Sequence, residues 1–242
     1  TEHYHAPTNA ALVVAGDQDI AKTKKMISEY YGPIPRGAEI TRNVPQEAPI
    51  TQEIREKAYD PNIQIPAAMV AYRTPGFRER DARILDMIST YLSDGRSSKL
   101  YKKLVDEQKQ ALQIGAFNIG QEDYGMYLIF GLPVGETSLQ TLVEEMEEEV
   151  QALRMGLISE KDYQKLQNKF ENNFVNSNST IAGIAGSLAT NYMLYGDTSL
   201  INKEIEIFRS ITREEIRDVA IKYLKPTQRA VIEYLPGDKM DN

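Results

Sequence analysis

The chain has 242 residues, of which 41% are hydrophobic and 26% charged, and its formal net charge is -7. These values are typical of a globular protein with room for a sizeable core, and they exclude a disordered or fibrous chain. The acidic balance argues against a nucleic-acid partner, the absence of cysteine excludes a thiol nucleophile and disulfides, and no apolar run reaches the roughly 18 residues of a membrane segment.

The beginning of the chain predicts a strand followed by a helix. Residues 10–15 are all apolar and end at Gly16, so we expect a buried strand. A helix is predicted from about residue 20 to residue 31, where Gly32 and Pro33 stop it. This strand and helix are interpreted as the end of one domain, residues 1–34.

A linker is predicted next. Residues 35–49 contain three Pro, one Gly and mixed charges without an apolar period, which is typical of an interdomain connection. We therefore expect a linker over residues 35–53 and a second domain over residues 54–242.

The second domain has a mixed pattern of strands and helices. Strands are expected at 53–59, 64–73 and 230–235, and a hairpin at 111–119 and 125–133. Helical spacing of apolar residues is present at 84–92, 100–105, 139–153, 163–174 and 216–223, and a small-residue segment at 181–195, ended by Gly196, is able to pack closely against a neighbour. Grouped strands and helices without a phosphate-binding glycine fingerprint predict an α+β, two-layer sandwich with a largely antiparallel sheet.

Several helix boundaries carry end signals. Ser97 or Ser98 is a candidate N-cap, Ser159 and Thr212 each open a candidate capping box, and Gly156 is a candidate left-handed stop.

A degenerate copy of the first segment returns at the far end of the chain, at a constant offset of 219 residues. The matched pairs are Tyr4 with Tyr223, Pro7 with Pro226, Thr8 with Thr227 and Ala11 with Ala230. So long a period favours a duplicated domain over a solenoid, whose repeats are far shorter. The first copy is then the last strand of a domain that is nearly all missing, and the second copy closes a complete domain.

Five segments in order and spacing resemble one protein family. They are PTNAALVVAGD at 7–17, YYGPIP at 30–35, AYRTPG at 71–76, GRSSKLY at 95–101 and GQED at 120–123. They are similar to the insulinase or pitrilysin type of zinc metallopeptidase, especially its small bacterial members that resemble the mitochondrial processing peptidase. The resemblance implies one half of a duplicated clamshell, acting on unfolded peptides in a closed chamber.

In that family the first half carries the zinc motif H-x-x-E-H, with two His ligands and a Glu base. That motif is absent here, since the chain has only His3 and His5 and neither is followed by a Glu-His pair. A His-x-His pair can ligate a metal, but two solvent-side histidines are the simpler interpretation. The resemblance therefore implies the zinc-free C-terminal half, with no catalytic or metal-binding residue in this chain and Zn²⁺ in the full-length protein.

The candidate substrate-binding residues are Arg96, Ser97, Ser98 and Tyr101. They occupy the position where processing peptidases have a glycine-rich substrate loop, although only Gly95 remains of the glycines. Arg96 and the N–H groups of a helix start are able to bind a carboxylate or backbone carbonyls, and a sheet edge can hold a peptide by strand addition. The alternative is that the serines only cap a helix while Tyr101 packs.

Two other features have simpler explanations. Five acidic residues at 144–149 are able to line an acidic chamber, but more often such a run is a solvated helix face. Asn178 fits a glycosylation acceptor, which we discount in a chain that resembles bacterial proteins.

Three functions remain open on the sequence. The chain is the substrate-binding half of a zinc metalloendopeptidase, the non-catalytic partner in a heterodimeric peptidase, or a scaffold like the core subunits of a respiratory complex. The expected partners are a peptide substrate and either the missing N-terminal half or a catalytic subunit, in a homo- or heterodimer. The compartment, bacterial cytoplasm or periplasm, stays open because the signal region is not in this chain.

Overall fold

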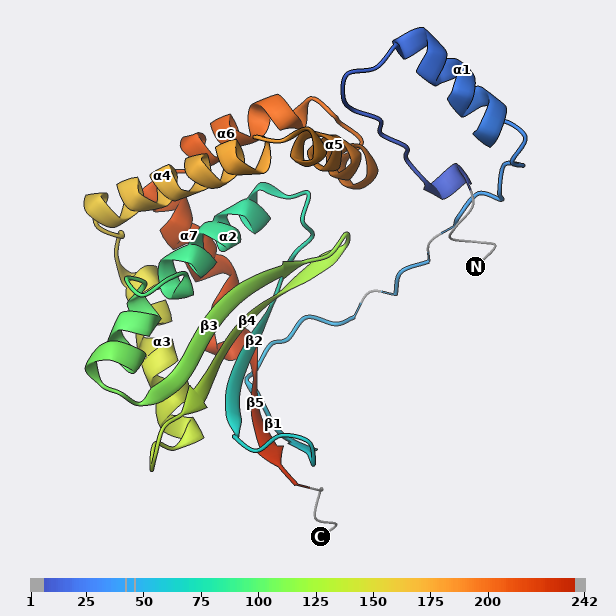
Figure 1. The fold of residues 1–242 in the computed structure, drawn as a ribbon. Coiled ribbons are helices and arrows are strands. Elements are labelled where there is room, and N and C mark those ends of the chain that lie inside the picture. The colour runs from blue at the N-terminus through green and yellow to red at the C-terminus, as the bar shows by residue number, and fades with distance from the viewer. Residues whose placement is uncertain (1–6, 42, 46, 238–242) are drawn as a thin grey trace. The chain divides into compact units, whose positions relative to one another are not determined.

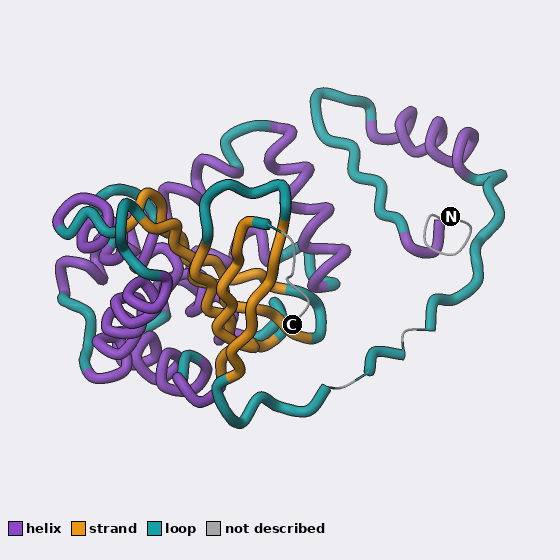
Figure 2. Tube along the Cα trace, turned by 90° about the horizontal axis from the view of Figure 1, so that it is seen from below, coloured by secondary structure: helices purple, strands orange, loops and turns teal. Residues whose placement is uncertain are grey.

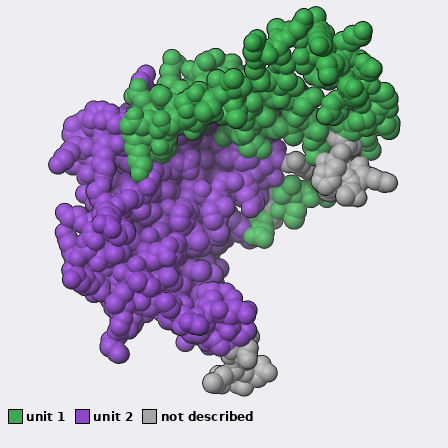
Figure 3. All heavy atoms as spheres, in the orientation of Figure 1, with its two compact units in different colours: residues 1–47, 169–207 green, residues 48–168, 208–242 purple. Residues whose placement is uncertain are grey.

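The computed structural model describes residues 7–41, 43–45 and 47–237. The chain separates into two compact units, which Figure 3 colours differently. The N-terminal unit comprises residues 1–47 and 169–207, and the sheet unit comprises residues 48–168 and 208–242. The domain boundaries expected from the sequence, at residues 34 and 54, stay a prediction.

The sheet unit is built on five strands in the order β1-β5-β2-β4-β3 (Figure 1). They are β1 (Ile54–Asp60), β2 (Ala67–Pro75), β3 (Ala111–Gly120), β4 (Tyr124–Pro133) and β5 (Arg229–Pro236). β1 and β5 pair in parallel, whereas β2 with β5, β2 with β4 and β3 with β4 are antiparallel. The last strand of the chain is thus inserted between the first two. This arrangement confirms the predicted α+β class with a largely antiparallel sheet.

Three helices cover one face of the sheet, as Figure 2 shows from below: α2 (Arg80–Ser93), α3 (Leu139–Met155) and α7 (Arg213–Tyr223). Strand side chains alternate between the two faces, so every second residue of β2 and β4 enters the layer between sheet and helices. The largest fully buried side chains there are Tyr72, Tyr127, Ile129, Ile84, Leu85, Met87, Ile88, Leu92, Leu142 and Met146. On β4, Gly131 permits close helix packing, because a Cβ there would lie 2.7 Å from the Met146 side chain.

An ionic cluster ties the start of β1 to this core. The Arg229 side chain, only 7% exposed, pairs with Glu53 at 2.7 Å and with Glu147 at 2.6 Å. Glu147 also pairs with Arg154, which donates to the carbonyl of Leu224. Burial, with Glu147 nearby, raises the pKa of the adjacent Tyr72 to about 12. The cluster therefore fixes the end of the predicted linker onto the sheet unit.

The remaining elements lie after α3 or before β1. They are α1 (Ile20–Tyr31), α4 (Glu160–Ser177), α5 (Ile181–Thr190), α6 (Leu200–Ser210), the π-helical segments η2 (Tyr101–Glu107) and η3 (Asn191–Tyr195), and the 3-10 turns η1 (Pro7–Asn9) and η4 (Pro226–Gln228). Sequence reasoning missed α6, although Leu200, Ile201, Ile205 and Phe208 have helical spacing.

The end signals predicted from the sequence have mixed outcomes. Thr212 and Glu215 form the complete capping box. Ser159 accepts from the Asp162 N–H, but its hydroxyl donates to the Asp162 carboxylate, so the reciprocal bond of a capping box is not formed there. The left-handed stop at Gly156 is wrong, because its φ of -153° and ψ of 172° are extended, and α3 simply runs into an extended connection.

The strand expected at residues 10–15 is not formed among the described residues, where Leu12 and Val14 are 54% and 45% exposed. A strand exists only through its ladder of hydrogen bonds, and no described segment pairs with this one. The repeat itself has a structural counterpart, since Pro7–Asn9 and Pro226–Gln228 both form a 3-10 turn at the offset of 219 residues.

Candidate functional site

The turn after α2 holds three of the four candidate binding residues. It begins at Gly95, whose φ of +83° is a left-handed conformation that favours glycine. The hydroxyl of the buried Ser98 donates to the Gly95 carbonyl at 2.6 Å, and the Ser98 N–H donates to the same oxygen at 3.1 Å. The cap suggested for Ser98 is therefore not made. The Ser98 hydroxyl instead bonds back to Gly95, the first residue of the turn.

Contacts with the start of α4 hold the turn from outside. The Lys165 ammonium donates to the Ser97 hydroxyl. Lys99 pairs with Asp162 at 3.0 Å and lies 5.3 Å from the centre of the Tyr91 ring. Partial burial acts to lower the pKa of Lys99, but the interactions with Asp162 and Tyr91 together outweigh it and raise that pKa. The Lys99–Asp162 pair is thus fully charged at neutral pH.

Arg96 and Tyr101 differ from the two serines in their surroundings. Arg96 is exposed, and its guanidinium has no hydrogen bond or ion pair with any residue that the structure describes. Tyr101 is half-buried and begins η2, where no described contact joins it to Arg96. The structure therefore brings Arg96, Ser97 and Ser98 into one turn and places Tyr101 on the following element.

The π-helical segment η2 is anchored by one lysine. The Lys103 ammonium contacts Glu145 at 2.8 Å, Glu148 at 2.7 Å and Glu149 at 3.4 Å. Burial acts against the charge of Lys103, yet these carboxylates raise its pKa. Three of the acidic residues on α3 thus fasten η2, and a fourth, Glu147, belongs to the cluster around Arg229. These contacts favour a structural role for the acidic run.

The edge strand β3 lies next to the turn. The Ser93 hydroxyl, at the end of α2, accepts from the Ala116 N–H at 2.7 Å and donates to the Ala116 carbonyl at 3.2 Å. Ser93 thereby occupies the outward backbone groups of β3 at this point. A peptide that adds along all of β3 has to displace these two bonds, whereas one that pairs with either end does not.

The sheet face opposite the three helices is largely apolar. Its residues alternate with the buried ones and are Met69, Ala71, Arg73, Phe117, Ile119, Met126, Leu128, Phe130, Leu132, Ile232 and Tyr234. Phe117 and Phe130 stack with ring centres 5.8 Å apart over Gly115, where a Cβ would lie 2.4 Å from the Phe130 ring. Exposed apolar patches of this kind mark interaction surfaces.

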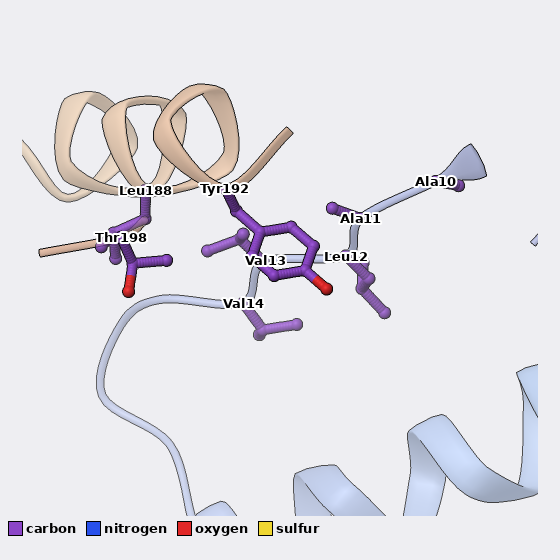
Figure 4. A pocket seen from close by; sticks show the side chains of 8 residues that line it. All are labelled: Ala10, Ala11, Leu12, Val13, Val14, Leu188, Tyr192 and Thr198. Carbon is purple, nitrogen blue, oxygen red and sulfur yellow. The ribbon is translucent and has the colours of Figure 1, made fainter. Parts of the chain in front are cut away.

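Two cavities accompany these surfaces. On the open sheet face, a cavity of about 450 Å³ is lined by Ile63, Gln64, Ile65, Ala67, Met69, Phe130, Leu132 and Tyr234. In the N-terminal unit, a cavity of about 590 Å³ lies between residues 10–14 and the segment that carries Leu188, Tyr192 and Thr198 (Figure 4). Both linings are mainly aliphatic and aromatic, so they suit apolar groups and provide no catalytic constellation.

The described residues contain no group of three His, Cys, Asp or Glu side chains able to hold a metal ion. His3 and His5 lie outside the described residues. Since the sequence also lacks H-x-x-E-H, the residues of this chain do not fit a catalytic zinc ion. Among the described helices, none has the length and apolar character needed to cross a bilayer.

Comparison with known proteins identifies the family. The model of the peptidase M16 inactive domain matches residues 1–170. This chain belongs to the M16 peptidase family. M16 is the insulinase-type family of zinc metallopeptidases, so the resemblance drawn from the five segments is confirmed.

Three relatives of this M16 chain are about twice as long. The zinc protease PqqE of Helicobacter pylori is 23% identical over 96% of this chain and 53% of its own length. The crystal structure of a protease from Helicobacter pylori superposes with a TM-score of 0.87 at 22% identity, over 97% of this chain and 57% of that one. A peptidase M16 inactive domain from Pseudomonas fluorescens gives 0.78 at 14% identity, over 94% and 54%. The chain thus spans about half the length of these relatives.

Sequence reasoning missed one residue that contacts the turn. Lys165 lies 68 residues from Ser97, and a surface lysine on a polar helix face has no local signal that pairs it with a distant hydroxyl. The open sheet face was missed as well, because alternation identifies two faces of a strand but not which of them the helices cover.

Proposed function

We propose that this M16 chain is the C-terminal, substrate-binding half of a zinc-dependent metalloendopeptidase that degrades or processes unfolded peptides in a closed chamber. The zinc site then lies in an N-terminal half or in a catalytic partner subunit. Membership in the inactive-domain family, the missing zinc motif and the half-length match to the zinc protease PqqE all support this division of labour.

The observation that carries the proposal is the turn at residues 95–98. It is fixed by Ser98 from inside and by Lys165 through Ser97 from outside, yet it leaves the Arg96 guanidinium exposed. A rigid turn with one cation that no described residue engages suits contact with a ligand. Arg96 and Tyr101 then hold a peptide but take no part in its chemistry.

The sheet supplies the second part of the proposed surface. As an edge strand, β3 offers backbone groups for strand addition, and the open face offers apolar contacts around Phe117 and Phe130. Neither surface selects a particular peptide sequence strongly. Backbone pairing is common to all peptides, and the open face accepts apolar side chains in general. Together they suit unfolded substrates of varied sequence.

The test is Arg96→Ala in the complete two-half protein. Because the contact is equally present in ground and transition states, KM rises while kcat stays nearly intact. An exposed charged contact is worth roughly 1 kcal/mol at most, so we expect about a five-fold loss in kcat/KM. Lys102→Ala is the matched control, because this exposed cation on the neighbouring helix pairs only weakly with Glu107 at 3.5 Å. An unchanged KM with native stability assigns the turn a structural role and moves the binding site elsewhere.

The non-catalytic partner and the scaffold are the alternatives to this function. The sequence of the other half distinguishes these two alternatives from the proposed function. H-x-x-E-H in the same polypeptide supports the enzyme, and its absence supports a partner subunit or a scaffold. Loss of peptide hydrolysis on removing zinc from the complete protein gives the same answer biochemically.

A further inference from the structure

The cations around the turn differ in how they are compensated. Lys99 is paired with Asp162, Lys102 with Glu107, and Lys103 with three glutamates. Among the described residues, Arg96 has no anionic partner. Lys165 donates to the neutral Ser97 hydroxyl and shares the negative charge of Asp162 with Lys99. The turn and the start of α4 therefore carry more cations than carboxylates, in a chain whose net charge is -7.

From this juxtaposition we propose that Arg96, Ser97 and Lys165 form a binding site for a peptide carboxylate. The inference rests on the proposed function and deepens it by naming the group that the turn recognises. Lys165 and Ser97 are its new elements, because Arg96 alone offers only a cation.

The donors are chemically suited to a carboxylate. Ser97 accepts a hydrogen bond from Lys165, so its own hydroxyl hydrogen is available to donate. Guanidinium forms paired hydrogen bonds with the two oxygens of a carboxylate, and ammonium adds a point charge. An anion bound here receives charged donors from Arg96 and Lys165 and a neutral donor from Ser97.

The surroundings keep these donors in place. Ser98 closes the turn through two hydrogen bonds to the Gly95 carbonyl, so the backbone that carries Arg96 and Ser97 does not need to be ordered on binding. The negative charge beside these donors on α4 is Asp162, which interacts with Lys165. Lys99 also pairs with Asp162 and Ser159 donates to it, so its repulsion of a bound anion is reduced.

A carboxylate reaches the site either from the C-terminus of a peptide or from an acidic side chain. The experiment compares three forms of one fluorescein-labelled unfolded peptide by anisotropy with the complete protein, in EDTA to prevent hydrolysis. One form ends in a free carboxylate, one in an amide, and one in an amide with Glu as the last residue.

We expect the free-acid peptide to bind about five-fold more tightly than the plain amide, and raised salt to reduce this preference. Lys165→Gln and Arg96→Gln each remove most of the preference for the free acid over the amide. Lys161→Gln, an exposed lysine on the same helix, is the matched control and retains the preference. If the Glu-containing amide binds like the free acid, the site stands and takes an acidic side chain.

Equal binding of all three peptides overturns the carboxylate site while leaving the proposed peptide-binding function intact. Failure of every peptide to bind overturns both. If Lys165→Gln and Arg96→Gln both retain the preference for the free acid, the carboxylate binds elsewhere. This result also overturns the inference.

Discussion

Replacing Glu215 by Gln tests how the first turn of α7 is stabilised. The Glu215 carboxylate accepts two hydrogen bonds from Arg80, at 2.8 and 3.1 Å, and one from the Thr212 N–H at 2.8 Å. Arg80 also bonds to the hydroxyl and carbonyl of Ser210, so one guanidinium joins α2, α6 and α7. Gln keeps an acceptor for Thr212 but loses the charge.

The expected loss is about 1 kcal/mol at pH 7. An ion pair of this exposure contributes roughly 0.2–1 kcal/mol, and a negative charge in the first helical turn contributes roughly 0.3–1 kcal/mol. Glu214→Gln is the matched control, since it removes a charge from the same turn, and no described residue pairs with Glu214. Glu214→Gln should cost only the contribution of a negative charge in the first helical turn.

The pH dependence follows from the pKa of Glu215. The hydrogen bond from Arg80, opposed by partial burial, lowers this pKa below its ordinary value of 4.5. A lowered folded-state pKa means that the stabilisation is complete above about pH 4.5 and is lost as pH falls through the folded-state value. The gap between wild type and Glu215→Gln should therefore narrow as the pH falls below about 4.5.

Urea unfolding followed by far-UV circular dichroism measures the effect, because the chain has no tryptophan. Wild type, Glu215→Gln and Glu214→Gln are compared at pH 7, 5 and 3. Equal losses in the two variants at pH 7, or a gap that does not narrow between pH 5 and pH 3, would refute the assigned ion pair.

Two further predictions concern packing and boundaries. Gly131→Val should destabilise the sheet unit by about 1–3 kcal/mol, since the added Cβ meets Met146 at 2.7 Å. Gly156→Ala, with no atom within 4 Å of its Cβ, should be nearly neutral in the same urea titration, and equal effects would contradict the packing argument. Limited proteolysis, read by mass spectrometry, should cut first within residues 35–51, and preferential cutting within 139–223 would contradict the expected boundary.

Elements with local signals could be predicted from the sequence. The β3–β4 hairpin follows from two apolar runs around a short turn, and α2 from apolar residues at helical spacing. The Thr212 capping box needs only residues three apart, and the structure contains both of its bonds. Each of these elements is determined by neighbours along the chain.

Features that depend on distant partners could not be predicted. The apolar pattern of residues 10–15 is that of a strand, but a ladder needs a second strand, which no described segment supplies. Insertion of β5 between β1 and β2 is likewise a long-range pairing. At the site, the sequence indicates Arg96 and the two serines, whereas the contact of Lys165 with Ser97 exists only once α4 lies beside the turn.

The conformation of single residues could not be predicted from the sequence either. A glycine after a helix is a reasonable left-handed stop, yet Gly156 has an extended conformation. Ser98 has the right position for a cap, but burial directs its hydroxyl to the Gly95 carbonyl. Side-chain choices of this kind depend on packing that local patterns do not encode.

Zinc content is the most direct test of the central claim that this chain is the zinc-free half of an M16 peptidase. The chain and the complete two-half protein are purified identically, dialysed against a dilute zinc buffer and measured by inductively coupled plasma mass spectrometry. The account predicts about one zinc ion per complete protein and none held tightly by this chain. One tightly held zinc ion in this chain, lost on replacing His3 and His5, would contradict it.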